Sequence, residues 1–231
     1  YSTNYACPDC GISIEEIEQS CNYAHNLNKK VRVFFHFFFT VCFPNHKNKP
    51  EYYQAYIRNY PKGRYITEAR FQVGHCYYLD APDARLDQAV TKKAIEFFTQ
   101  FVEFYPESPY AEQAYKEMGE LYDKLAEKEY LSAKLYYNLG TYLGNNYLSA
   151  EIVAKNALKN FPTNRYQEDL NWIILQAKYQ QTLNSFEDKK MERARETEDE
   201  YYSFIASFPE SKHRNAAERI GKEIKKILGH E

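Results

Sequence analysis

The chain has 231 residues with a formal net charge of −2 and a sequence pI near 6.4. That balance gives no basic surface for nucleic acid and no polybasic stripe for an anionic membrane, so nucleic acid is not an expected partner. The 8 glycines and 23 tyrosines favour rings packed between helices over a sheet with many tight turns.

Residues 1–48 are predicted to be a divergent N-terminal segment or a degenerate first helix pair, ahead of a helical repeat domain at 49–231. Five cysteines are an odd count, so they cannot all pair within the chain. A C-x2-C-x10-C-x3-H pattern of the kind that can hold zinc is formed by Cys7, Cys10, Cys21 and His25. The alternatives are a redox pair of the first two cysteines and an irregular segment without a site. We favour the irregular segment and expect no metal and no cofactor.

The run VFFHFFFTVCF at 33–43 holds a histidine and is too short to span a bilayer. It is read either as a patch that contacts a partner or a membrane, or as the inner face of a first helix pair, which we favour. Because the chain starts at Tyr1 rather than methionine, we expect any targeting segment to have been removed or left out.

An aromatic residue followed by proline then recurs four times along the chain. The pairs are Tyr60-Pro61, Tyr105-Pro106, Phe161-Pro162 and Phe208-Pro209. Proline disfavours the α conformation in the residue before it, so each pair predicts the end of one helix and a turn into the next. Ser108 is the expected N-cap after the second pair, with Pro109 as the first helical residue, and Asn164 with Gln167 resembles a capping box after the third.

Apolar periodicity between these junctions predicts a chain of amphipathic helices. Their ranges are 51–60, 65–79, 89–105, 109–126, 129–143, 147–160, 164–184, 190–208 and 212–228. Gly74 and Gly119 each lie 13 residues past a proline, and Tyr77 and Tyr122 each lie 16 past it. Small positions at Ala94, Ala150 and Ala157 and large ones at Phe98 and Tyr201 complete the pattern.

This alternation of small and large residues is typical of tetratricopeptide repeats, whose period is about 34 residues. The prolines here are 45, 56 and 47 residues apart. The excess is assigned to a polar loop at 79–88, to an additional helix at 129–143 carrying Ala133, Tyr137 and Gly140, and to a long helix followed by the charged run 187–200. The predicted fold is therefore an all-α tetratricopeptide solenoid with a concave binding face.

Two stretches carry a resemblance to a known family: YLDAPDARLDQAVTKKAIEFFTQFVEFYPESPYAEQA (78–114) and LYDKLAEKEYLSAKLYYNLGTYLGNNYLSAEIVAKNALKNFP (121–162). They resemble the BamD-type tetratricopeptide lipoproteins of the outer-membrane β-barrel assembly (BAM) machinery, in a Bacteroidetes-like branch. The resemblance covers about residues 51–229. It implies a non-enzymatic scaffold at the periplasmic face of the outer membrane, held by an N-terminal lipid, that docks to periplasmic domains of the barrel-forming subunit. It also implies contact with other BAM lipoproteins and with unfolded outer-membrane protein substrates.

The chain departs from that family at two places. No lipidated cysteine can be identified, because Cys7 in NYACPDCG lacks the small-residue context after an apolar run that lipidation needs. Where the family carries a basic residue that contacts the barrel-forming subunit, this chain has Val153, with Lys155 as the nearest base.

The turn GNNYLSA at 144–150 is the expected partner contact, through Asn145, Asn146 and Tyr147. The alternative is a plain left-handed turn between helices, which Gly144 and the asparagines also suit. Arg165 and Tyr166 are expected at the same end of the solenoid, where they would extend the patch.

No catalytic motif is recognised in the sequence. His75 and Cys76 are neighbours that point about 100° apart on a helix, so burial of the thiol is preferred to a nucleophile and base. Acid pairs such as Glu198 and Glu200 are expected on a solvated helix face.

The favoured function is a non-enzymatic BAM scaffold. The alternatives are a general periplasmic tetratricopeptide adaptor and a zinc-dependent regulator or enzyme built on the N-terminal cysteines.

Overall fold

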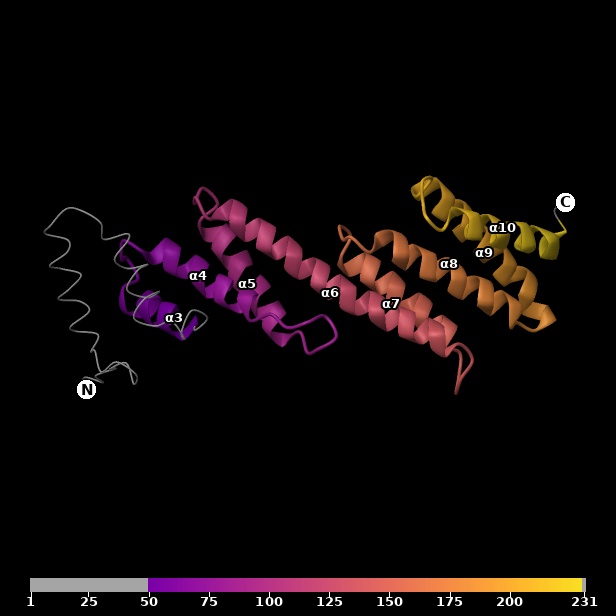
Figure 1. Ribbon diagram of the computed structural model, residues 1–231, viewed down its shortest axis with the longest axis horizontal. Helices are drawn as coiled ribbons and strands as arrows, with labels where there is room; N and C mark the ends of the chain where they lie inside the picture. The colour runs from indigo at the N-terminus through magenta and orange to yellow at the C-terminus, as the bar shows by residue number, and fades with distance from the viewer. Residues whose placement is uncertain (1–49, 230–231) are drawn as a thin grey trace, which may run out of the picture.

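The structure is a computed structural model that describes residues 50–229. That part of the chain is all-helical, with no β-strand, and its elements run in sequence along an elongated solenoid (Figure 1). The helices are α3 (Pro50–Asn59), α4 (Ile66–Leu79), α5 (Ala89–Phe104), α6 (Ala111–Leu139), α7 (Asn146–Asn160), α8 (Gln167–Leu183), α9 (Glu187–Ser207) and α10 (Arg214–Leu228). The predicted fold class is confirmed.

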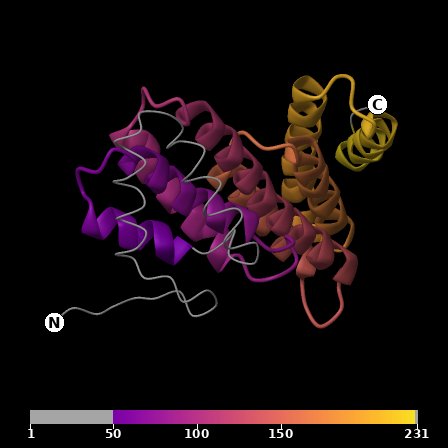
Figure 2. The ribbon, with the colours of Figure 1, turned by 60° about the vertical axis from the view of Figure 1, so that its left-hand side comes forward.

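Consecutive helices pack side by side and antiparallel, and the helices that follow the prolines also contact one another, α4 with α6, α6 with α8 and α8 with α10. The aromatic-proline turns therefore gather at one edge of the solenoid, and the turns α4–α5, α6–α7 and α8–α9 gather at the other (Figure 1). Figure 2 shows the same alternation after rotation. We call these the proline edge and the loop edge.

The aromatic-proline pairs end their helices in one repeated conformation. Tyr105, Phe161 and Phe208 have φ between −129° and −135° and ψ between 56° and 70°, outside the helical region. Each still donates its backbone N–H to the carbonyl four residues earlier, at 2.9 Å. Proline forces the residue before it out of the α conformation, so α5 and α9 each stop one residue earlier than expected, while α7 ends at Asn160 as predicted.

The two residues expected to cap the next helices instead accept hydrogen bonds from backbone N–H groups within the turns that precede those helices. Ser108 Oγ accepts the N–H of Tyr110 at 3.3 Å, and Asn164 Oδ1 accepts the N–H of Tyr166 at 2.7 Å. The helices then begin at Ala111 and Gln167 without a side-chain cap. The predicted N-cap at Ser108 and capping box at Asn164 were therefore wrong, because these side chains satisfy the turn's own backbone first.

The residue immediately before each of these helices is aromatic, and its ring holds the junction against the preceding repeat. Tyr110 stacks on Phe71 with ring centroids 5.0 Å apart, and Tyr166 stacks on Tyr130 at 5.2 Å. His213 stacks on Trp172 at 4.7 Å with the planes 5° apart. Ring stacking offsets the poor capping chemistry of an aromatic at this position.

The small-large register is confirmed at Gly74 but not at Gly119. A Cβ on Gly74 would come within 2.7 Å of the Phe98 ring, whereas a Cβ on Gly119 would meet nothing within 4 Å. Another helical glycine with a ring this close is Gly221, where a Cβ would come within 2.8 Å of Tyr201. Ala94, Ala150 and Ala157 are fully buried, as predicted.

The predicted helices 109–126 and 129–143 form one continuous helix, α6, of 29 residues. The stretch that spans the expected break, LAEKEY at 125–130, holds neither glycine nor proline, so nothing in it interrupts helical hydrogen bonding. Gly140, at φ +58°, ends the helix. The extra length between the second and third prolines is therefore an elongated helix rather than an additional one.

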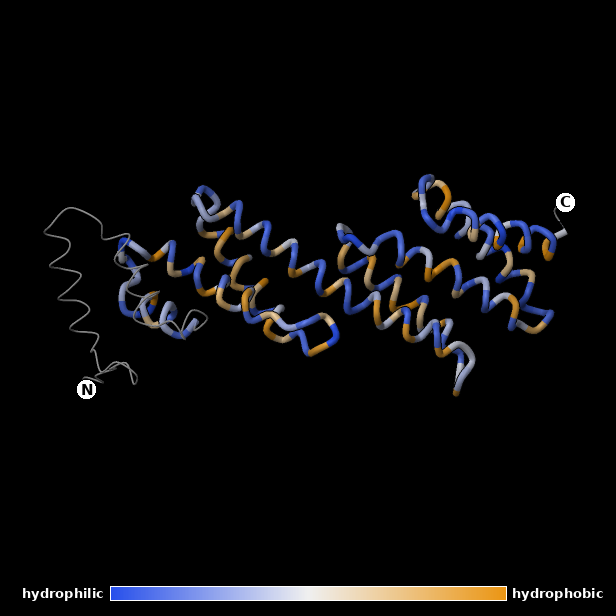
Figure 3. Tube along the Cα trace, in the orientation of Figure 1, coloured by the Kyte–Doolittle hydropathy of each residue, from blue (hydrophilic) through white to orange (hydrophobic). Residues whose placement is uncertain are grey.

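The continuity of α6 joins two parts of the core. Its first half packs Leu121 into a cluster with Phe71 and Phe98. Its second half packs Ala133 into a cluster with α7 and α8 that includes Leu170. A third cluster joins α8, α9 and α10. Apolar residues accordingly line the inner sides of the helices in Figure 3, and α6 makes the solenoid continuous across its middle.

Candidate protein-binding surface

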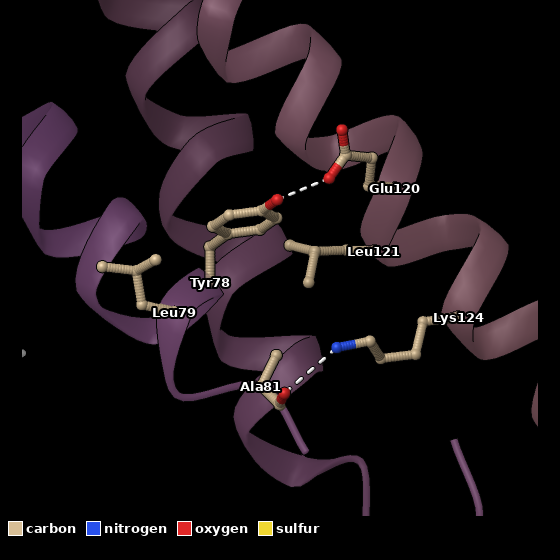
Figure 4. Close-up of a pocket in the computed structure, with 6 residues that line it drawn as sticks. All are labelled: Tyr78, Leu79, Ala81, Glu120, Leu121 and Lys124. Atoms are coloured by element: carbon tan, nitrogen blue, oxygen red, sulfur yellow. Dashed lines mark hydrogen bonds between the residues drawn. The ribbon is translucent and has the colours of Figure 1, made fainter. Parts of the chain in front are cut away.

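A shallow groove of about 290 Å³ lies between α4 and α6, the first pair of post-proline helices in contact (Figure 4). It is lined by Tyr78, Leu79, Ala81, Glu120, Leu121 and Lys124. Leu121 is fully buried beneath the groove, while half of Leu79 is exposed at its side. The groove thus combines an apolar floor with one acidic and one basic side chain.

Two hydrogen bonds tie the walls of this groove together. The Tyr78 hydroxyl donates to a carboxylate oxygen of Glu120, and Lys124 Nζ donates to the carbonyl of Ala81 at 3.0 Å (Figure 4). The bond to Glu120, followed by burial, raises the pKa of Tyr78 to about 12. The hydroxyl consequently remains a hydrogen-bond donor at all physiological pH values.

The same bond recurs at the other end of the solenoid, where the Tyr179 hydroxyl donates to Glu223 of α10. Burial and this bond raise the pKa of Tyr179 to about 12. Each tyrosine lies 17 residues past its proline and each glutamate 14 past the next one. Sequence reasoning missed these residues, although their shared offset from the prolines was a signal that could have found them.

A further side-chain link joins α4 to α6 one helical turn before Tyr78 and Glu120. His75 Nδ1 lies 2.9 Å and 3.0 Å from the two carboxylate oxygens of Glu117, which also accepts a 2.7 Å hydrogen bond from Gln113. Glu117 is only 5% exposed. Its carboxylate is therefore committed to holding the two repeats together rather than being free for a ligand.

The chemistry of the groove suits binding. Glu120 and Lys124 are held in place by their partners, so their remaining hydrogen-bonding sites are pre-positioned for polar groups of a docked chain. The volume fits one or two side chains and lies at the lower end of small-molecule pockets. Among residues 50–229, no group of three or more His, Cys, Asp or Glu side chains is placed to bind a metal ion.

The predicted contact residues of the α6–α7 turn are largely engaged in its own structure. Asn145 Oδ1 caps α7 by accepting the N–H of Leu148 at 3.3 Å, and Asn146 Nδ2 donates to the carbonyl of Tyr142 at 2.6 Å. The Tyr147 ring packs on Tyr137 at 5.6 Å and covers Gly140. Their role in binding a partner stays a prediction.

Arg165 and Tyr166 lie at the proline edge, whereas the α6–α7 turn lies at the loop edge (Figure 1). The full length of α7, on the order of 20 Å, separates them. The expectation of one patch at one end of the solenoid was therefore wrong. Arg165 donates its backbone N–H to Asp123 at 3.1 Å and places its guanidinium 5.5 Å from the centre of the Tyr166 ring.

On α7 itself, Lys155 forms an exposed ion pair with Glu151 at 2.6 Å. Val153 is partly buried against the central cluster. Lys155 lies two residues after Val153, so the chain presents its base about 200° around α7 from the aligned position.

Cys76 is 1% exposed, and burial raises the pKa of its thiol to about 12. It is not an activated nucleophile, which agrees with the preferred expectation.

Glu200 pairs with Lys178 at 2.9 Å. The zinc pattern and the aromatic run at 33–43 lie outside the described residues.

Fold and surface together define a helical repeat protein with a groove suited to protein contacts. Residues 39–144 match the model of the YfiO family, described as outer membrane lipoproteins. The match spans a little under half of the chain and includes α3 to α6. No curated protein matches the chain significantly. In the part of the chain that the structure describes, no helix combines the length and apolar character needed to cross a bilayer.

Proposed function

We propose that this chain is a non-enzymatic scaffold subunit of the machinery that assembles β-barrel proteins in the outer membrane, acting at the periplasmic face. The observation that carries the proposal is the family match over α3 to α6, a stretch that includes the two helices lining the α4–α6 groove. In this proposal the scaffold docks to periplasmic domains of the barrel-forming subunit and helps to recruit or insert outer-membrane proteins.

The structure supports a role in rigid presentation. His75 and Tyr78 of α4 bond to side chains of α6. Lys124 and Lys128 of α6 donate to carbonyls of the α4–α5 loop. Tyr179 joins α8 to Glu223 of α10. Asp169 of α8 lies 2.7 Å from Lys212 and 3.3 Å from His213, both in the turn before α10. Such clamps keep the post-proline helices in a fixed register. A partner then binds a preformed surface and incurs little ordering cost.

The test is co-purification of the chain with the barrel-forming subunit from envelope membranes. Lys155→Ala and Arg165→Ala, each truncating an exposed base of the predicted contact, are expected to weaken the complex about tenfold if each base contacts the subunit. Lys116→Ala, an exposed base elsewhere on α6, is the matched control. Tyr147 is unsuitable because its ring packs on Tyr137 and Gly140.

A general periplasmic adaptor is the second candidate, because a solenoid groove does not specify its ligand. Recovery of the chain with an unrelated envelope complex, and without the barrel-forming subunit, would favour that candidate and contradict the proposed one.

A further inference from the structure

Two loops on the loop edge present large apolar side chains to solvent. Leu143 of the α6–α7 loop is 90% exposed and its neighbour Tyr142 is 68% exposed. Phe186 of the α8–α9 loop is 87% exposed. Both loops lie at the same edge in Figure 1, and the tip of the α6–α7 loop is coloured as apolar in Figure 3.

Both apolar residues stand where local stability favours another residue type. Leu143 has φ +56°, a left-handed conformation that is unfavourable for a residue with a branched side chain. Phe186 is the N-cap of α9 and makes no side-chain cap hydrogen bond, a position that favours Ser, Thr, Asp or Asn. Aromatic residues also precede α6, α8 and α10, but those rings stack on preceding helices. Neither loop residue has a packing reason of this kind.

The connections that carry these tips hold no charged residue, and the acidic first turn of α9, Glu187 and Asp188, begins directly after Phe186. The α6–α7 connection reads GTYLGN and the α8–α9 connection reads NSF, without an acidic or basic residue. The proline-edge turns, in contrast, carry charged residues such as Lys62, Glu107 and Lys212. The α4–α5 loop also carries charges, at Asp83, Arg85 and Asp87. In the part of the chain that the structure describes, helix connections without a charged residue are thus confined to these two loop-edge turns.

We propose that these two tips insert into the interfacial region of a lipid bilayer and orient the solenoid with its loop edge toward the membrane. Protruding side chains on separate loops suit a fluid apolar layer, which needs no matching shape, better than a protein interface, which needs a packed contiguous core. Tyr142 adds a ring whose hydroxyl can stay among the headgroups.

Two further features agree with a lipid surface as the occupant. Leu135 and Leu139, one turn apart near the end of α6, are also exposed and continue the apolar surface toward the loop. The family whose model matches residues 39–144 is described as outer membrane lipoproteins, which reside at such a surface. The inference goes beyond docking to a protein partner and does not require it.

The test uses the chain with vesicles of phosphatidylethanolamine and phosphatidylglycerol in a flotation assay. The double variant Leu143→Asn/Phe186→Ser removes both apolar tips with residues that suit their backbone positions. We expect its vesicle affinity to fall at least about tenfold. Phe104→Ser is the matched control, because Phe104 is 68% exposed at the proline edge, and it should float like the wild type.

Tryptophan fluorescence provides a second readout, which reports whether the α6–α7 loop enters the bilayer. Tryptophan emission of Tyr142→Trp should shift to the blue on adding vesicles, while that of Phe104→Trp should not. The inference is overturned if the wild type does not float, if the double variant floats equally well, or if the variant loses a protein partner while its vesicle binding is unchanged. Loss of the barrel-forming subunit with normal flotation of the wild type would contradict the proposed function alone.

Discussion

The Phe98 ring lies directly over Gly74, so close that a Cβ on the glycine would come within 2.7 Å of it. Phe98 is fully buried and cannot move aside. Gly74→Ala should therefore lower the free energy of unfolding by about 1–3 kcal/mol through overpacking. Urea unfolding followed by circular dichroism measures the change.

Gly119→Ala is the matched control for that substitution, since both glycines lie on helices 13 residues past a proline. A Cβ at residue 119 meets nothing within 4 Å. Alanine should therefore stabilise α6 by about 0.5–1 kcal/mol through its higher helix propensity. Equal effects of the two substitutions would show that the helices do not approach closely at Gly74.

The apolar loop tips should be stabilised by residues that match their backbone. Leu143→Gly removes the cost of φ +56° and should raise the free energy of unfolding by about 1 kcal/mol. Phe186→Ser should add about 0.5–1 kcal/mol by capping α9. Thermal unfolding of each single variant checks these values. A loss of stability in either variant would mean that the apolar side chain has a structural role.

The tyrosine–glutamate bonds predict an alkaline limit to stability. The folded-state pKa values of Tyr78 and Tyr179 lie at about 12, above the ordinary 10.0. The unfolded chain loses these protons first, so the stabilisation is complete below pH 10 and is lost as pH rises toward 12. The double variant Tyr78→Phe/Tyr179→Phe should show a shallower fall in stability across this window, and it should lose about 0.5–1.5 kcal/mol per bond at neutral pH.

Denaturant unfolding at a series of pH values from neutral to alkaline makes that comparison. Cys76 and Tyr53 also have pKa values raised to about 12 and remain in both proteins, so the variant should retain part of the dependence. Identical pH profiles for the two proteins would contradict the predicted contribution of these hydroxyls.

Burial predicts that the Cys76 thiol is unreactive in the folded chain. At 1% exposure, with its pKa raised to about 12, it should resist alkylation at neutral pH and react only on unfolding. Peptide mapping by mass spectrometry after iodoacetamide treatment distinguishes it from the other four cysteines. Rapid alkylation of Cys76 under native conditions would show that α4 opens locally.

Much of the fold follows from local sequence. Proline restricts the residue before it wherever it occurs, so the four aromatic-proline pairs determine where helices end, and the apolar period of the segments between them determines that they are amphipathic helices. The fully buried Ala94 and Ala150 were predictable for the same reason, as small residues on the inner faces.

Tertiary structure decided what depends on contacts between distant residues. Gly74 and Gly119 share a position relative to proline, yet only Gly74 has a ring above it, because the neighbouring helix determines the space over a glycine. The split of Asn145 and Arg165 between opposite edges depends on the length and direction of α7. The Tyr78–Glu120 bond and the groove beside it exist only because α4 and α6 pack side by side, a contact between residues 42 apart in the sequence.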